Sequence, residues 1–192
     1  MTESFRVLVG YATAAGSTQE IAERIAGRLE RAADEVVVRP VGPDLDPARF
    51  NALVLGSAVH GMSWLPPALD FLRRAASTTG HCPTWCFSVG GLAPGPGRAG
   101  RLSGQELRRI EQGFPTGFRP LEHRIFGGVV QTAGVPWYGR LFWRAAGGQP
   151  GDQRDWPAIE AWADTIAAEL ESRRTAPSSR ADRSLISDAE GR

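Results

Sequence analysis

The residues of this chain whose types and spacing suggest a binding function begin in the segment 12–18, which reads ATAAGST. Its hydroxyl and glycine residues are Thr13, Gly16, Ser17 and Thr18. The segment follows an apolar run and precedes a helical pattern. Backbone N–H groups at a helix N-terminus attract anions, and hydroxyls add uncharged donors. We therefore predict that it binds a phosphate monoester. The alternative is an ordinary helix start, in which Ser17 and Glu20 form a capping box.

Two later segments also follow apolar runs: 57–64, with the sequence SAVHGMSW, and 88–94, with the sequence SVGGLAP. The flat side chains of His60 and Trp64 could stack on a planar ligand. For Trp64 the alternative is packing on the sheet edge, since aromatic residues are common in cores. The glycines that would let the backbone turn, or let a ligand approach it, are Gly61, Gly90 and Gly91.

These segments must be positioned by strands and helices that alternate along the chain. Apolar, β-branched runs predict strands at 5–11, 35–40, 50–57, 84–89 and 124–131. Apolar residues at helical spacing predict helices at 17–32, 65–76, 103–112 and 155–173. Such an alternation predicts right-handed βαβ units, and hence an α/β domain with a doubly wound parallel sheet of five strands. Ligands of such sheets bind beyond the carboxyl ends of the strands, where the three segments above would lie.

The domain should occupy residues 1–173, followed by a polar tail at 174–192 that we expect to be disordered.

The segment 11–18 resembles the FMN phosphate loop of flavodoxins, because Thr13, Gly16, Ser17 and Thr18 match its pattern of hydroxyl and glycine residues. Ala15 replaces the middle hydroxyl residue of that pattern. The resemblance covers residues 5–170 and implies the strand order 2-1-3-4-5, with FMN as cofactor. It also implies a set of cofactor-binding residues: Thr13, Ala14, Ala15, Gly16, Ser17, Thr18, Ala58, Val59, His60, Gly61, Trp64, Ser88, Gly90, Gly91 and Leu92.

Composition excludes several other kinds of protein. All 22 basic residues are arginines, which excludes a Schiff-base lysine and a Walker-type lysine. The formal net charge of +1 argues against a nucleic-acid partner. Cys82 and Cys86 form no paired metal motif, and the three histidines lack ligand spacing, so we expect no metal. Only His60 is a candidate for proton transfer, and no other catalytic residue is assigned.

The segment 134–148 contains an aromatic and arginine-rich run followed by Gly147 and Gly148. With Asp155 and Trp156 it resembles the quinone-dependent protoporphyrinogen dehydrogenases of flavodoxin type. This resemblance implies an enzyme of heme biosynthesis that passes electrons from protoporphyrinogen IX through FMN to a quinone. Residues 136–144 are amphipathic and could lie on a membrane surface, or fold back on the domain.

The charge distribution and the N-terminal sequence indicate the expected cellular localisation of the protein. Residues 98–144 contain eight arginines and three acidic residues, a local excess of five positive charges that would suit an anionic membrane or substrate. No signal peptide or membrane-spanning run is visible, so we expect a cytoplasmic protein, with contact to the inner face of the membrane as an option.

Two other functions remain open at this stage. One is a one-electron shuttle that meets a redox partner and has no small-molecule substrate. The other is a module that keeps the fold for interaction and binds no flavin, because the phosphate segment contains no cation and Ala15 departs from the pattern. The oligomeric state does not follow from the sequence.

Overall fold

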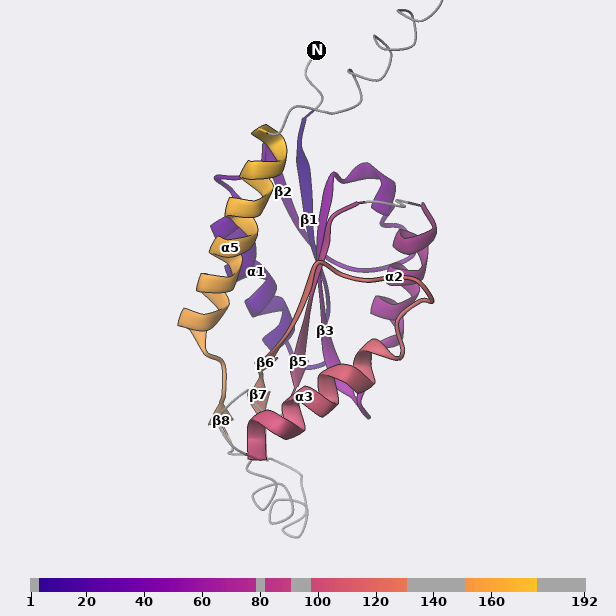
Figure 1. Cartoon of the computed structure of the whole chain (residues 1–192), viewed down its shortest axis with the longest axis vertical. Helices are drawn as coiled ribbons and strands as arrows, with labels where there is room; N and C mark the ends of the chain where they lie inside the picture. Colours follow the sequence, from indigo (N-terminus) through magenta and orange to yellow (C-terminus); the bar gives the residue numbers. More distant parts are fainter. Residues whose placement is uncertain (1–3, 79–81, 91–97, 131–150, 176–192) are drawn as a thin grey trace, which may run out of the picture.

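The centre of the molecule is a parallel sheet. The computed structural model describes residues 4–78, 82–90, 98–130 and 151–175, with the side chains of 98–102 and 130 excepted (Figure 1). The five parallel strands are β1 (Arg6–Ala12), β2 (Glu35–Pro40), β3 (Ala52–His60), β5 (Thr84–Gly90) and β6 (Glu122–Gly127). They lie in the order β2-β1-β3-β5-β6, which confirms the predicted five-stranded doubly wound sheet and its strand order.

Three short strands were not predicted as separate elements. The strand β4 (Ser63–Trp64) pairs antiparallel with the end of β3. The strands β7 (Val129–Val130) and β8 (Gly151–Asp152) form a separate antiparallel pair. The predicted fifth strand, 124–131, is thereby divided: β6 ends at Gly127, and the chain continues into β7 from Gly128, whose N–H donates to the carbonyl of Gly90 over 3.0 Å.

Helices cover both faces of the sheet (Figure 1). One face carries α1 (Ser17–Leu29) and α5 (Trp156–Thr175), and the other carries α2 (Pro66–Thr78) and α3 (Arg98–Glu111). A 3-10 turn, η1 (Pro47–Arg49), precedes β3. Helix α3 begins five residues before the predicted start at 103, because Ser103 is buried inside the helix and does not cap it. Within the described ranges, no helix combines the length and apolarity needed to cross a membrane.

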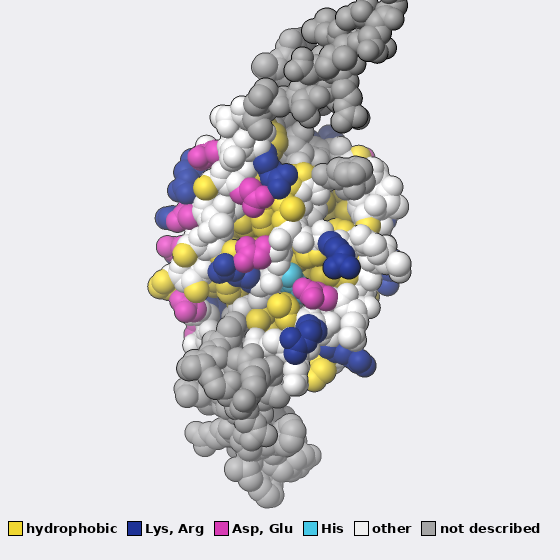
Figure 2. Space-filling view, in the orientation of Figure 1, with side chains coloured by type: hydrophobic (Ala, Val, Ile, Leu, Met, Phe, Trp, Pro, Cys, Tyr) yellow, Lys and Arg dark blue, Asp and Glu magenta, His cyan; other side chains and the backbone are white. Residues whose placement is uncertain are grey.

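The helix faces that the sequence pattern predicted are buried. On α1, Ile21, Ile25 and Leu29 are fully buried in the core that this helix shares with α5. Charged pairs on the outer side join the same two helices, including Arg24 with Glu160 over 2.5 Å. Figure 2 shows acidic and basic side chains interspersed along the α5 side of the molecule. Burial of an apolar stripe fixes α1 and α5 against the sheet, while exposed ion pairs add little to stability.

The predicted domain boundary at 173 lies near the end of α5, which runs to Thr175. Residues 176–192 of the predicted tail lie outside the described residues. Residues 136–144, predicted to meet a membrane, also lie outside them, as do Gly91 and Leu92.

Candidate functional site

The carboxyl ends of the central strands meet at one edge of the sheet, the lower edge in Figure 1. The segment after β1 leads directly into α1, the segment after β3 turns back into β4, and β7 and β8 lie beside the end of β6. This arrangement brings the first predicted binding segment close to the ends of β5 and β6.

The first wall is the start of α1. Gly16 is the N-cap residue and adopts a left-handed conformation with a φ of 93°, which glycine adopts without strain. The hydroxyl oxygen of Thr13 accepts a hydrogen bond from the N–H of Gly16 over 2.9 Å, which holds the turn closed. No side chain caps the helix. The predicted capping box of Ser17 and Glu20 is therefore wrong, because Ser17 is already the first helical residue.

The hydroxyl of Thr18 is the decisive feature of this wall. Thr18 is fully buried, and its Oγ1 is a buried polar side-chain atom with no hydrogen-bond partner among the described residues. An unpaired buried hydroxyl costs about 1–3 kcal/mol, so native proteins rarely keep one without a ligand or water to satisfy it. The hydroxyl lies in the first turn of α1, where backbone N–H groups also lack helical acceptors. The donor set thus fits an anion such as a phosphate group.

The second wall is a pair of glycines that the sequence analysis missed. The N–H of Gly128 bonds to Gly90, and a Cβ on Gly128 would lie 3.0 Å from a methyl group of Val89 and 3.4 Å from the hydroxyl oxygen of Ser17. A Cβ on Gly127 would lie only 2.2 Å from the carbonyl oxygen of Gln153. Gly127 therefore requires glycine, because backbone blocks its Cβ position, and Gly128 is closely packed. A Gly-Gly pair inside an apolar run was the available signal, because glycine in a strand pattern often marks a close backbone approach.

The turn between β3 and β4 forms the third wall. Both Gly61 and Met62 have a positive φ, of 58° and 61°, so these two residues make the tight reversal that returns the chain into β4. His60 is exposed, and Met62 is 58% exposed, which is unusual for a large apolar side chain. Ala58 and Val59 are half-buried just before the turn. Gly61 therefore adopts the positive φ that the sequence suggested for it, and Met62 adopts one as well.

Trp64 does not belong to this exposed turn. Its side chain is 3% exposed and lies in the core beneath α2, with its ring 4.8 Å from that of Phe114 between centroids. The prediction that Trp64 covers a planar ligand is corrected in favour of the alternative, packing at the sheet. The physical reason is the pairing of β4 with β3, which sets Trp64 opposite Val59 and directs its indole inward.

Ser88 is likewise turned into the protein. Its hydroxyl oxygen accepts a hydrogen bond from the indole N–H of Trp64 over 2.7 Å and lies 2.9 Å from Nε2 of His123. The other ring nitrogen of His123 lies 3.1 Å from a carboxylate oxygen of Glu111. Because an indole can only donate and an ionised carboxylate can only accept, the chain is satisfied when Ser88 donates to Nε2 and His123 donates to Glu111. The hydroxyl of Ser88 is therefore occupied within the protein, and only the backbone of Ser88 could make the predicted contact with a ligand.

This network holds the imidazole of His123 in its neutral form. The side chain is 1% exposed, and its burial lowers the pKa, although the facing carboxylate of Glu111 acts in the opposite direction. Neutral histidine is also the form that the hydrogen bond from Ser88 requires. The network is therefore a structural support under the end of β5.

A further carboxyl group lies at the end of β5. The side chain of Glu106, on α3, is half-buried, and its Oε1 lies 3.2 Å from the position that a Cβ on Gly90 would occupy. Burial raises the pKa of this carboxyl group. The sequence indicated a helix position for Glu106 at the capping-box offset from Ser103, and this capping box is wrong because α3 already begins at Arg98. Its approach to Gly90 depends on how α3 crosses the sheet.

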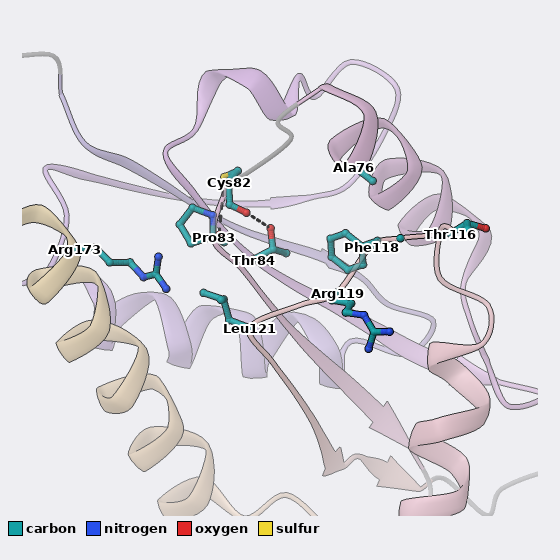
Figure 3. Close-up of a pocket in the computed structure, with 10 residues that line it drawn as sticks. Ala76, Cys82, Pro83, Thr84, Thr116, Phe118, Arg119, Leu121 and Arg173 are labelled. Atoms are coloured by element: carbon teal, nitrogen blue, oxygen red, sulfur yellow. Dashed lines mark hydrogen bonds between the residues drawn. The ribbon is translucent and has the colours of Figure 1, made fainter. Parts of the chain in front are cut away.

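A separate cavity of about 410 Å³ lies at the opposite edge of the sheet, at the amino end of β5 (Figure 3). Figure 3 shows Arg119 and Arg173 on two sides of it, with Cys82 and Thr84 between them. Burial raises the pKa of the Cys82 thiol to about 11, so this thiol is protonated at neutral pH. The cavity shares no residue with the three walls described above.

Comparison with known proteins agrees with this geometry. A scan of protein families matches residues 8–146 to the flavodoxin domain family. A search of curated proteins returns no match. The match confirms the predicted resemblance to flavodoxins and FMN as the cofactor that accompanies this family. None of the comparisons supports the narrower resemblance to protoporphyrinogen dehydrogenases.

Solved structures share the fold at low sequence identity. A flavodoxin from the domain Archaea is 17% identical, with a TM-score of 0.50 over 87% of this chain and 99% of its own. A short-chain flavodoxin associated with a bacterial microcompartment is 13% identical, with a TM-score of 0.54 over 88% and 98%. The flavodiiron core from Synechocystis is 16% identical, with a TM-score of 0.54 over 90% of this chain but only 37% of its own. These likenesses establish the fold.

Proposed function

Because the chain belongs to the flavodoxin domain family, we propose that it binds FMN at the carboxyl edge of the sheet and transfers electrons to or from a redox partner. The observation that carries the proposal is the buried hydroxyl of Thr18, which has no partner among the described residues and belongs to the first turn of α1. FMN supplies the redox chemistry when bound, and the protein supplies binding, orientation and electrostatics.

The phosphate would be bound without contact to a positively charged side chain of the segment 12–18. The donors are the N–H groups of the first turn of α1 and the hydroxyls of Ser17 and Thr18. Thr13 already accepts from Gly16, so its own O–H proton remains to be donated. Residues 12–18 contain no basic side chain, so the charge of the phosphate is met by aligned peptide dipoles.

The flavin ring would lie between the β3–β4 turn and the end of β5. Gly90 offers backbone without a side chain at that place, and the Ser88 network fixes the strand beneath it. The exposed side chains of His60 and Met62 flank the turn and offer a surface that a redox partner can contact. His60 stays the one predicted candidate for proton transfer. Electron transfer itself needs no side-chain acid or base.

Purified protein titrated with FMN tests the proposal. Bound FMN should quench its fluorescence, and the protein should stay yellow after gel filtration. Ser17→Ala and Thr18→Val should each weaken FMN binding, because both remove a donor to the phosphate. A colourless protein that fails to bind added FMN would refute the flavin function and favour a flavin-free interaction module.

The narrower hypothesis is oxidation of protoporphyrinogen IX with a quinone as acceptor. It depends on residues 134–148, which lie outside the described residues, and it is favoured by one observation: β7 and β8, which flank the undescribed stretch, lie at the proposed FMN edge. FMN-loaded protein incubated with protoporphyrinogen and a quinone tests it, and deletion of 136–144 should abolish turnover while FMN stays bound. Clean reversible reduction without turnover would identify a one-electron shuttle instead.

A further inference from the structure

The guanidinium of Arg154 is bound on the outer side of the proposed phosphate site. The side chain is only 10% exposed, although arginine is usually at the surface. It donates to Glu20 over 2.5 Å and to Asp152 over 2.8 Å and 2.7 Å. Its guanidinium carbon also lies 4.6 Å from the ring centroid of Trp156. These contacts hold Arg154 in one place and use three of the five N–H donors of its guanidinium.

These contacts join β8 to the start of α1. Glu20 lies in the first turn, where its N–H donates to the carbonyl of Gly16 over 3.1 Å. On the other side, Gln153 donates its N–H to Gly128 over 3.0 Å, and Gly128 packs against Ser17. The segment that carries Arg154 therefore touches the phosphate site at Gly128 and again at Glu20.

Charge gives this connection a consequence for binding. A carboxylate in the first turn of a helix interacts favourably with the helix dipole. The same carboxylate would repel a phosphate bound at that end of the helix. Glu20 is such a carboxylate, and Asp152 adds a second close by. Arg154 is paired with both, so removing it would leave two uncompensated negative charges beside the anion site.

We propose that Arg154 is a positioning residue of the phosphate site, which cancels the charge of Glu20 and fixes β8 against the first turn of α1 so that the helix end can accept the FMN phosphate. The inference rests on the proposed function. It assigns to the site a residue that lies 134 positions from Glu20 and outside every predicted binding segment. The proposal implies a preference for FMN over riboflavin, which lacks the phosphate.

The test compares dissociation constants for FMN and riboflavin, measured by flavin fluorescence at low ionic strength. Arg154→Gln should weaken FMN about fivefold, the size of a charge effect at a helix terminus, and leave riboflavin unchanged. Raising the salt concentration should shrink the difference, because the interaction is electrostatic. The double variant Glu20→Gln with Arg154→Gln should recover part of the affinity for FMN, since the charge of Glu20 is then absent and only that of Asp152 remains unpaired.

Arg24→Gln is the matched control. Arg24 also stacks on Trp156, at 4.8 Å, and also joins α1 to α5, through Glu160, but its contacts lie one turn farther along α1. This variant should bind FMN as the unaltered protein does. Equal weakening of FMN and riboflavin by Arg154→Gln, or failure of the double variant to recover, would overturn the inference while the proposed function stands. If the unaltered protein binds no FMN, the proposed function falls and the inference with it.

Discussion

Replacement of Thr18 by valine should change protein stability and FMN affinity in opposite directions. Valine has the shape of threonine without the hydroxyl, and Thr18 is fully buried with its Oγ1 unpartnered among the described residues. Without FMN, Thr18→Val therefore removes a buried polar atom that gains nothing from the protein. We expect the apo variant to be more stable by about 1 kcal/mol, the lower end of the cost of an unsatisfied buried group. For a chain of this size that corresponds to a rise in melting temperature of about 2–4 °C.

For FMN binding, the expected effect of Thr18→Val is unfavourable. A hydrogen bond to a charged group contributes roughly 1.5–3 kcal/mol, so losing the donor to the phosphate should weaken FMN by about tenfold or more. Riboflavin should bind the variant as it binds the unaltered protein. Thermal unfolding of the apo protein, together with titration of both flavins, measures each effect separately.

Thr84→Val is the matched control for this experiment. Thr84 is also a buried threonine, but its hydroxyl donates to the carbonyl of Cys82 over 3.0 Å at the opposite edge of the sheet. Its removal should destabilise the protein by about 0.5–1.5 kcal/mol and leave FMN affinity unchanged. The reasoning would be refuted if Thr18→Val destabilised the apo protein as Thr84→Val does and bound FMN with unaltered affinity.

Three further predictions concern the supports of the site. Gly127→Ala should lower both stability and FMN affinity, because its Cβ would lie 2.2 Å from the carbonyl oxygen of Gln153; thermal unfolding and FMN titration measure this, and an unchanged variant would contradict the close packing. Burial lowers the pKa of His123 in the folded protein, so below about pH 6.5 the unfolded state binds more protons and the free energy of unfolding should fall; urea unfolding should show this slope, and an undiminished slope in His123→Gln would contradict the reasoning. Trp64→Phe removes the donor to Ser88 and should destabilise the protein by about 1–3 kcal/mol with little effect on FMN affinity; a large selective loss of FMN binding would instead place the indole at the flavin.

Local pattern was enough to predict the fold. The apolar runs of β1, β3 and β5 and the spacing of Ile21, Ile25 and Leu29 on α1 are short-range features, because each element must bury its own apolar face. The same is true of the segment after β1, where hydroxyls and glycine precede a helix start. The sequence therefore identified the sheet and its helices, and the family match agrees with that fold.

The sequence alone was less reliable for side chains whose role depends on distant partners. Trp64 and Ser88 lie in predicted binding segments, yet both turn inward because His123 and Glu111 complete a hydrogen-bond network with them. Ser17 has the spacing of a capping box with Glu20, but Gly16 takes the cap. Local spacing shows which residues can interact, whereas tertiary packing decides whether a local contact or a contact with a distant residue forms.

The sequence by itself determined the order of strands and helices along the chain and the predicted place of an anion-binding segment, since both follow from periodicity and from the chemistry of a helix start. Only the tertiary structure decided that Thr18 keeps a buried hydroxyl without a partner among the described residues, that Gly128 closes against Ser17, and that Arg154 neutralises Glu20. These features join residues that are far apart in the chain. They arise because the parallel sheet brings the ends of its strands to one edge, and no local pattern encodes which of them will meet there.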